Sequence, residues 1–260
     1  MLQNIKTLIQ YRYLLYVWVM EDIREKYYET FLGPAWLIVQ PLLLTLVFTV
    51  AFTVFARIGP AGIPYPVFFL VGYLPWDYFS TSITKGSRSV VSNLRTISDF
   101  AFPRELLVLS VMISALVDFL AGVIVVSVMF VLYRQPLFIS VLWIIPVFSV
   151  QLILTAGLMF WLSTLNATRR DVEPILLPLL RGLFYLSPVI YPLNRVSPTI
   201  VQYYLLNPIA GLITGYRDVL FDGKLSHSGA FIWATIIAVG VFVSGYTYFK
   251  RNEWTFADVI

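Results

Sequence analysis

The sequence predicts an all-helical protein that crosses a membrane several times. Of its 260 residues, 59% are hydrophobic and 12% are charged, whereas about a quarter of the residues of a soluble domain are charged. Three stretches of 27, 34 and 25 residues contain no Asp, Glu, Lys or Arg, at positions 30–56, 135–168 and 225–249. Each exceeds the roughly 20 apolar residues that cross a bilayer as a helix. These observations exclude an ordinary soluble protein.

Residues 3–31 predict an amphipathic helix that lies on the membrane surface. The apolar run from Tyr13 to Met20 is too short to span a bilayer, and acidic and basic side chains surround it. A signal peptide would carry its positive charges before the apolar run and a cleavage site of small residues after it. Tyrosine and tryptophan side chains suit the headgroup level of a surface helix.

Six membrane-spanning helices are expected after this segment. They cover residues 34–56, 65–84, 106–132, 141–165, 174–191 and 230–249. Several contain a proline, which a membrane bundle tolerates because neighbouring helices and water satisfy the freed backbone groups. The even spacing of the spans indicates one domain over residues 1–260.

The distribution of Lys and Arg predicts that both termini are cytoplasmic. The N-terminal segment, the loops near 85–105 and 166–173 and the C-terminal tail carry 12 of these 18 residues, whereas the opposite loops carry 5. Loops rich in Lys and Arg remain on the cytoplasmic side of a membrane.

The segment from Pro192 to Gly229 is apolar, but proline and glycine interrupt it too often for a further span. Non-helical backbone persists at membrane depth only where it is buried in protein or faces water. We therefore expect two short helices within residues 193–222 that dip back from the outer face. The alternative is a loop that lies on the outer surface.

The residues give no sign of enzymatic chemistry. The Gly-Lys pair Gly223-Lys224 is followed by Leu225 rather than Ser or Thr, so the chain lacks a phosphate-binding loop. The chain has no cysteine and one histidine, and its acidic cluster near residue 22 is interleaved with basic residues. We expect no catalytic residue, no metal and no cofactor.

Short motifs at the helix junctions occur in a specific order. They are Arg24-Glu25-Lys26-Tyr27, Leu32-Gly33-Pro34-Ala35-Trp36, Pro41, Leu74-Pro75-Trp76-Asp77-Tyr78-Phe79, Asn93-Leu94, Phe102-Pro103-Arg104-Glu105, Arg170-Asp171-Val172, Tyr185-Leu186-Ser187-Pro188-Val189-Ile190-Tyr191, Asn207-Pro208, Arg217 and Phe256-Ala257-Asp258-Val259-Ile260. From about residue 20 onward, this order resembles the membrane subunit of the ABC-2 exporters that move bacterial surface polysaccharides.

The resemblance implies a homodimer in the bacterial inner membrane with a channel between its six-helix subunits. Two copies of a separate ATPase would bind ATP and magnesium on the cytoplasmic face. The cargo would be a glycan on an undecaprenyl diphosphate carrier, with O-antigen expected and capsule or teichoic acid as alternatives. Membrane lipids are further partners, and nucleic acid is not expected.

The resemblance also implies roles for segments of this chain. The N-terminal helix and the loop 85–105 would contact the ATPase, with coupling at Asn93, Arg95 and Asp99. The helices within 193–222 would gate the outer side through Tyr203, Tyr204, Asn207, Pro208 and Arg217.

Two other classes of membrane protein compete with this interpretation. A secondary transporter or channel would need several intramembrane acids, and only Asp118 and Asp77 qualify. A lipid-processing enzyme would need a cluster of carboxylates or a His/Asp site at the membrane boundary.

Several basic residues are candidates for contact with the lipid diphosphate, because guanidinium groups bind phosphate bidentately. They are Arg24, Lys26, Arg88, Arg104 and Arg181. The alternative for those at the cytoplasmic boundary, where Arg95, Arg169 and Arg170 also lie, is contact with anionic lipid headgroups, at about 1 kcal/mol each. For Arg181, within the fifth span, the alternative is an ion pair with Asp118 that fixes helix packing.

Two aromatic stripes are candidates for the channel lining. Each stripe occupies one helix face at the spacing i, i+4 and i+7. The first span contains Phe48, Phe52 and Phe55, and the second contains Phe69, Tyr73 and Trp76. Aromatic rings can stack on the apolar faces of sugars. The alternative is helix packing or an interfacial aromatic belt.

Overall fold

The computed structural model describes residues 10–28, 30–57, 59–60, 62–169 and 171–258, and these residues form helices without any strand. The longer helices are α2 (Arg12–Tyr27), α3 (Trp36–Thr49), α4 (Tyr65–Arg88), α6 (Glu105–Leu132), α7 (Ile144–Thr168), α8 (Val172–Tyr185) and α11 (Ser228–Asn252). The shorter helices are α5 (Leu94–Asp99), α9 (Pro198–Tyr204) and α10 (Pro208–Arg217). The prediction of an all-helical protein is confirmed.

Single helical turns extend or connect these elements. The 3-10 turns are η1 (Gly33–Ala35), η3 (Val91–Asn93), η4 (Ile139–Trp143), η5 (Leu193–Arg195) and η7 (Glu253–Asp258). Two π-helical turns, η2 (Val50–Phe55) and η6 (Asp218–Asp222), continue α3 and α10. Residues 3–9 and 29 of the expected surface helix lie outside the described residues.

Within the described residues, four segments are long and apolar enough to cross a bilayer: Gly33–Phe55, Glu105–Leu132, Ile139–Thr168 and Ser228–Phe256. They overlap four of the six expected spans. Helix α4 has 24 residues but carries several charged and hydroxyl side chains. Helix α8 has 14 residues and extends for only about 21 Å at 1.5 Å per residue. The count of six spans therefore stays a prediction.

Helix α8 ends at Tyr185, whereas the sequence predicted a span to residue 191. Pro188 cannot donate a backbone hydrogen bond and therefore does not continue the helix. The chain forms a turn there instead, and Ser187 to Ile190 are buried. Tyr65 of α4 donates a hydrogen bond of 2.8 Å to the backbone oxygen of Ile190. This turn belongs to the packed interior of the bundle.

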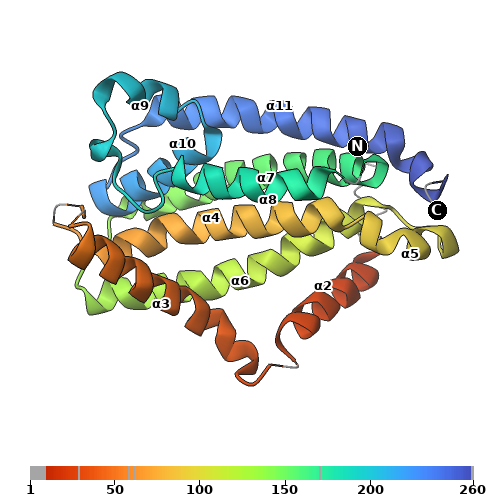
Figure 1. Ribbon diagram of the computed structural model, residues 1–260, viewed down its shortest axis with the longest axis horizontal. Coiled ribbons are helices and arrows are strands. Elements are labelled where there is room, and N and C mark those ends of the chain that lie inside the picture. The colour runs from red at the N-terminus through yellow and green to blue at the C-terminus, as the bar shows by residue number, and fades with distance from the viewer. Residues whose placement is uncertain (1–9, 29, 58, 61, 170, 259–260) are drawn as a thin grey trace.

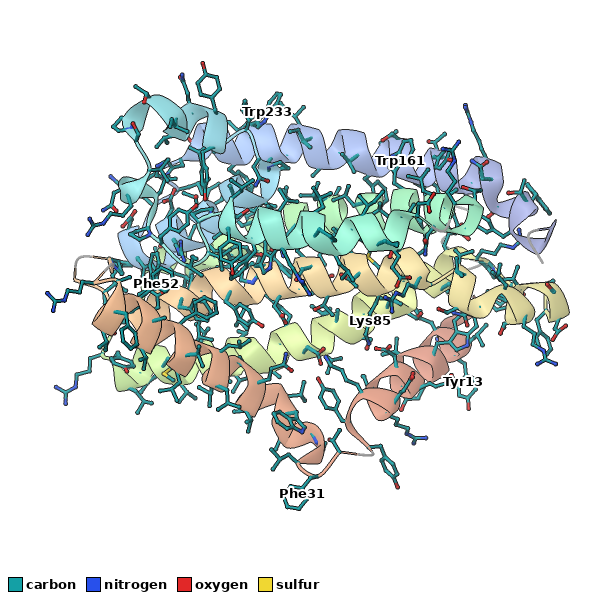
Figure 2. All side chains as sticks on the ribbon, in the orientation of Figure 1. Tyr13, Phe31, Phe52, Lys85, Trp161 and Trp233 are labelled. Carbon is teal, nitrogen blue, oxygen red and sulfur yellow. The ribbon has the colours of Figure 1, made fainter. Side chains whose placement is uncertain are left out.

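The long helices run side by side along one axis, and α4 contacts α3, α6, α7, α8 and α10 (Figure 1). Helices α5 and η7 lie at one end of the bundle, and α9 and α10 lie at the other. Helices α2 and α3 form a V whose tip projects away from the bundle. Phe31 lies at this tip (Figure 2) and is fully exposed. Gly33, with a φ of +52°, and the following Pro34 reverse the chain there.

The tightest contact in the bundle joins α7 to α11. A Cβ atom on Gly157 would lie 2.6 Å from the Cα atom of Phe242, which is backbone and cannot give way. One turn away, the indole nitrogen of Trp161 donates to the Ser244 hydroxyl at 3.1 Å, and the Trp161 ring stacks on Tyr248. The glycines Gly157 and Gly245 let the two backbones touch, so α7 and α11 form a rigid pair.

Candidate functional site

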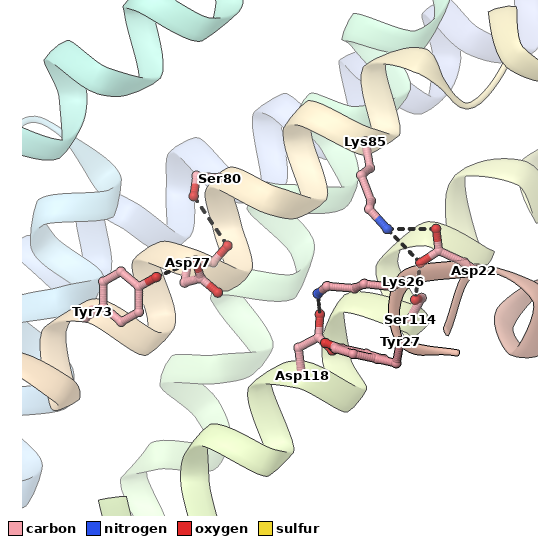
Figure 3. A network of polar contacts seen from close by, with 9 residues as sticks. All are labelled: Asp22, Lys26, Tyr27, Tyr73, Asp77, Ser80, Lys85, Ser114 and Asp118. Atoms are coloured by element: carbon pink, nitrogen blue, oxygen red, sulfur yellow. Dashed lines mark hydrogen bonds and ion pairs between the residues drawn. The ribbon is translucent and has the colours of Figure 1, made fainter. Parts of the chain in front are cut away.

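Charged side chains fasten helix α2 to the bundle (Figure 3). The Nζ atom of Lys85, on α4, lies 2.7 and 2.8 Å from the two carboxylate oxygens of Asp22 on α2. The hydroxyl of Ser114, on α6, donates to the same carboxylate. Asp22 therefore holds α2 against two helices at once.

Asp118 is paired with α2 and not with Arg181. The ammonium group of Lys26 forms an ion pair with one carboxylate oxygen of Asp118, and the Tyr27 hydroxyl donates to the other at 2.7 Å. Burial and this hydrogen bond raise the pKa of Tyr27, so its hydroxyl remains a donor. The proposed pair of Asp118 with Arg181 is therefore wrong for this conformation, because α2 folds back along α6 and supplies both partners.

Asp77 faces a small cavity beside this network. It accepts a hydrogen bond of 2.9 Å from Tyr73, one turn earlier on α4. The cavity has a volume of about 170 Å³, and Lys26, Gln40 and Asp118 also line it. Asp77 and Asp118 thus lie at one cavity between the α2–α3 turn, α4 and α6. Lys26 and Lys85, which line the same cavity, supply the opposite charge.

A larger groove lies between α4 and α8. It has a volume of about 510 Å³ and contains Arg181 together with hydroxyl and aromatic side chains. Its lining residues are Trp76, Ser80, Thr81, Thr84, Lys85, Leu177, Leu180, Arg181, Phe184 and Tyr185. Arg181 forms no ion pair or hydrogen bond with the part of the chain that the structure describes.

Most of the candidate lining aromatics pack α3 against α4 in this conformation. The rings of Phe48 and Phe69 stack with centroids 4.7 Å apart, and Phe52 stacks on Tyr65 at 5.8 Å. Phe69 has no exposed surface, and Tyr73 and Trp76 are buried too. Phe55 differs, because 80% of its surface is exposed. Helix packing thus accounts for Phe48, Phe52 and Phe69 here, and a lining role for the two stripes stays a prediction.

The basic residues that the sequence predicts at the cytoplasmic boundary have different surroundings. Arg88 forms an ion pair with Glu173 of α8. The Arg104 guanidinium lies 5.9 Å from the centroid of the Trp254 ring. Arg24 is exposed on α2. Arg170 lies outside the described residues. Lys26 and Arg88 thus form ion pairs within the chain, whereas Arg24 and Arg181 form none with the described residues.

The loop 85–105 contains η3 and α5 and projects from the end of the bundle that also carries η7 (Figure 1). Arg95 and Asp99 are exposed on α5, and Asn93 donates to the backbone oxygen of Ser89 at 2.8 Å. A cavity of about 660 Å³ lies between this loop, α2 and α6, and Asn93 lines it. The three coupling candidates therefore occupy an accessible surface.

The segment that the sequence predicts on the outer side is organised around buried Arg217. Its guanidinium donates to the backbone oxygens of Pro188, Val189 at 2.7 Å and Phe68 at 3.2 Å, and it lies 3.6 Å from the centroid of the Phe68 ring. Backbone oxygens therefore stabilise its charge, and they come from α4 and from the turn after α8. Gly72 makes room for it, because a Cβ there would lie 3.1 Å from Cζ of Arg217.

Among the other gate candidates, Asn207 and Tyr204 form hydrogen bonds with residues that follow α8. Asn207 caps α10 by accepting from the backbone N–H of Ile209, and its amide donates to the Ser187 hydroxyl at 3.1 Å. Pro208 is the first residue of α10, where a proline is tolerated. The Tyr204 hydroxyl lies 2.7 Å from that of Tyr191, whereas Tyr203 is exposed on α9. Helix α10 is buried in protein from Ile209 to Arg217.

Sequence reasoning missed several residues of these networks. The sequence indicated only that Asp22 lies in an acidic cluster interleaved with basic residues, and it singled out neither Lys85 nor Gln151. Gln151 has no exposed surface; it donates to the backbone oxygen of Pro75 at 2.7 Å and accepts from the Tyr216 hydroxyl at 2.8 Å. An amide near the middle of a 34-residue uncharged stretch was the available signal.

Comparison with known proteins agrees with the family inferred from the motifs. The family model for the ABC-2 type transporter matches residues 13–221. The chain is 30% identical over 264 residues to the O-antigen export system permease protein RfbA of Myxococcus xanthus, covering 100% of both chains. It is 28% identical over 248 residues to the protein of that name from Klebsiella pneumoniae, covering 95% of each.

A more distant relative is named for the transport of a different polysaccharide. The chain is 19% identical over 236 residues to the polysialic acid transport protein KpsM of Escherichia coli, covering 90% of this chain and 91% of the relative. The family model and the full-length similarity lead to one conclusion: the chain belongs to the ABC-2 type transporter family of membrane permeases.

Proposed function

We propose that this chain is the channel-forming subunit of an ATP-driven exporter that moves an undecaprenyl-diphosphate-linked polysaccharide, O-antigen, across the bacterial inner membrane. The observation that carries this proposal is the similarity along the whole chain to permeases named for O-antigen export. The relative named for polysialic acid transport is less similar, so a capsule is the second candidate cargo.

The proposed subunit has six spans, with α2 on the cytoplasmic membrane surface and both termini in the cytoplasm. Helices α2, α5 and η7 carry many charged side chains, and α5 and η7 lie at the opposite end of the bundle from α9 and α10 (Figure 1). This arrangement supports a cytoplasmic face at α5 and an outer face at α9 and α10.

The proposed assembly is a homodimer with two copies of a separate ATPase, which binds ATP and magnesium. Exposed apolar side chains on α3 and α8 support the proposal of a dimer. Leu46, Val47 and Leu179 are among them. The exposed α5 and its cavity against α2 support contact with the ATPase. The chain itself supplies the path and binds no cofactor.

Two experiments test the function and the topology. Deleting the gene should leave lipid-linked glycan inside the cell, and its chemical analysis identifies the cargo; an unchanged surface glycan would contradict the proposal. A Ser226→Cys variant of the cysteine-free chain should react with an impermeant thiol reagent added outside intact spheroplasts. Reaction only after the inner face is opened would reverse the topology.

A further inference from the structure

We propose that the groove between α4 and α8 binds the phosphorylated sugar at the lipid-linked end of the exported chain, with Arg181 as the ligand of the phosphate. This inference rests on the proposed function. It names the part of the cargo that the groove recognises and the side chains that recognise it.

The position of Arg181 is the first argument. It lies nine residues after the start of α8, which places it about 14 Å along the helix axis at 1.5 Å per residue. A charge at this depth is costly unless a partner or water satisfies it, and such residues mark functional sites. Within the described residues Asp118 is taken by Lys26 and Tyr27, and Arg181 has no partner. Its partner is therefore expected from outside the chain.

The neighbouring cation is already neutralised. Lys85 lines the same groove, but its ammonium group contacts both oxygens of Asp22. Of the two basic side chains that line the groove, Arg181 is therefore the one whose charge can bind an anion. A planar guanidinium with five N–H donors matches the oxygens of a phosphate group.

The hydroxyl groups of α4 provide the opposite hydrogen-bonding chemistry. Thr84 donates to the backbone oxygen of Ser80 at 2.7 Å, and Ser80 donates to that of Asp77 at 3.3 Å. Each hydroxyl has one hydrogen and two acceptor lone pairs, so both of these oxygens remain free to accept from a ligand. Thr81 has no intrachain hydrogen bond among the described residues and can both donate and accept.

Aromatic side chains complete the groove. The Trp76 and Phe184 rings lie with centroids 5.6 Å apart and both line it. Apolar ring faces suit the C–H faces of a sugar, and a volume of about 510 Å³ lies within the usual range for small-ligand sites. A guanidinium that binds an anion at one wall, hydroxyl oxygens that accept hydrogen bonds at the other and aromatic rings that suit a sugar face together describe a site for a sugar phosphate. A phospholipid supplies the phosphate but lacks the sugar ring.

The experiment measures binding to the purified full-length chain in nanodiscs of uncharged lipid. The probes are radiolabelled undecaprenyl diphosphate with and without an N-acetylglucosamine residue, and phosphatidylglycerol serves as the competitor. The test variants are Arg181→Gln, Arg181→Lys and Thr81→Val. The matched controls are Arg251→Gln and Thr247→Val, which remove the same groups from exposed positions on α11.

We expect Arg181→Gln to weaken binding of both diphosphate probes at least tenfold, since a charged hydrogen bond contributes about 1.5–3 kcal/mol. Arg181→Lys should recover part of this loss, because an ammonium group is a point charge without the planar fork. Thr81→Val should weaken only the sugar-bearing probe, by about threefold. The control variants should bind as the unmodified chain does.

Several results would overturn the proposal. Equal binding by Arg181→Gln and the unmodified chain would remove Arg181 from the site, and equal competition by phosphatidylglycerol would make the groove a general site for anionic lipids. A shift of Arg181→Gln from dimer to monomer with unchanged binding would make the groove a subunit contact. An unmodified chain that binds no probe and does not co-purify with an ATPase contradicts the proposed function itself.

Discussion

The ammonium group of Lys85 and the carboxylate of Asp22 join α4 to α2 through hydrogen bonds of 2.7 and 2.8 Å. Both side chains are partly exposed, at 37% and 26%, so solvent weakens the ion pair. The contact nevertheless helps to hold α2 on the bundle, because Val19 and Tyr27 are the buried residues of this helix.

We expect Lys85→Met to lower the free energy of unfolding by about 1–2 kcal/mol, because it leaves Asp22 with Ser114 as its remaining partner. The combined Lys85→Met, Asp22→Leu variant should recover part of this loss. Thermal unfolding in detergent measures both. Additive losses in the double variant would show that the two side chains do not interact.

Exchanging the charges of Lys26 and Asp118 should separate the two partners considered for Asp118. Asp118→Lys should destabilise the protein, and the addition of Lys26→Asp should restore part of the stability because the ion pair reforms with reversed polarity. Asp118→Arg with Arg181→Asp should show no such recovery, since Arg181 lies at another groove. The melting temperatures of the four variants measure this, and rescue by the Arg181 exchange would refute the observed pairing.

Gly72→Ala should displace the Arg217 guanidinium and loosen the outer segment. The new Cβ would lie 3.1 Å from Cζ of Arg217 and 3.2 Å from the backbone oxygen of Val189. We expect reduced export and faster proteolysis between residues 186 and 207. Gly215→Ala is the control on α10, because its Cβ would meet its neighbours at an ordinary 3.6 Å or more. Similar effects of both changes would argue against a specific role of Arg217.

Reversing the charge at Arg95 or Asp99 should weaken association with the ATPase and leave the membrane subunit folded, because both side chains are exposed on α5. Co-purification of the ATPase and the thermal stability of the subunit are the two measurements. Normal export by the doubly reversed variant would place the coupling in another segment.

Phe69→Ala and Phe55→Ala should have different effects although both residues belong to the candidate lining. Phe69 is fully buried, and its loss should cost about 3–5 kcal/mol of stability. Phe55 is 80% exposed, so its loss should change stability little. Stability in detergent and ion leakage in cells are measured together. Leakage from Phe69→Ala at unchanged stability would favour the lining role over helix packing.

The apolar spans could be predicted because a bilayer sets the length of the elements that cross it. The stretches without charge around residues 30–56 and 135–168 became helices at nearly the expected positions. The short helices α9 and α10 could also be predicted from the sequence, because Pro198 begins one and Pro208 begins the other.

The packing could not be predicted, for a physical reason. The helical period shows that Phe48, Phe52 and Phe55 share a face, but lipid and protein interior are both apolar, so composition does not say which face meets which. The pairing of Lys26 with Asp118 joins residues 92 positions apart, and it depends on α2 turning back along α6. The end of α8 was also misplaced, because the buried turn at Ser187 to Ile190 is as apolar as a span.

Two helices whose backbones touch cannot slide or rotate past each other without overlap. The contact at Gly157 and Gly245 therefore makes α7 and α11 a single stiff beam that is about 37 Å long at 1.5 Å per residue. If the proposed ATPase docks at the end that carries α5 and η7, force applied there would reach the end that carries α9 and α10 along these two helices. In the proposed exporter, a change in the width of the path would therefore come from movement of other helices against this pair.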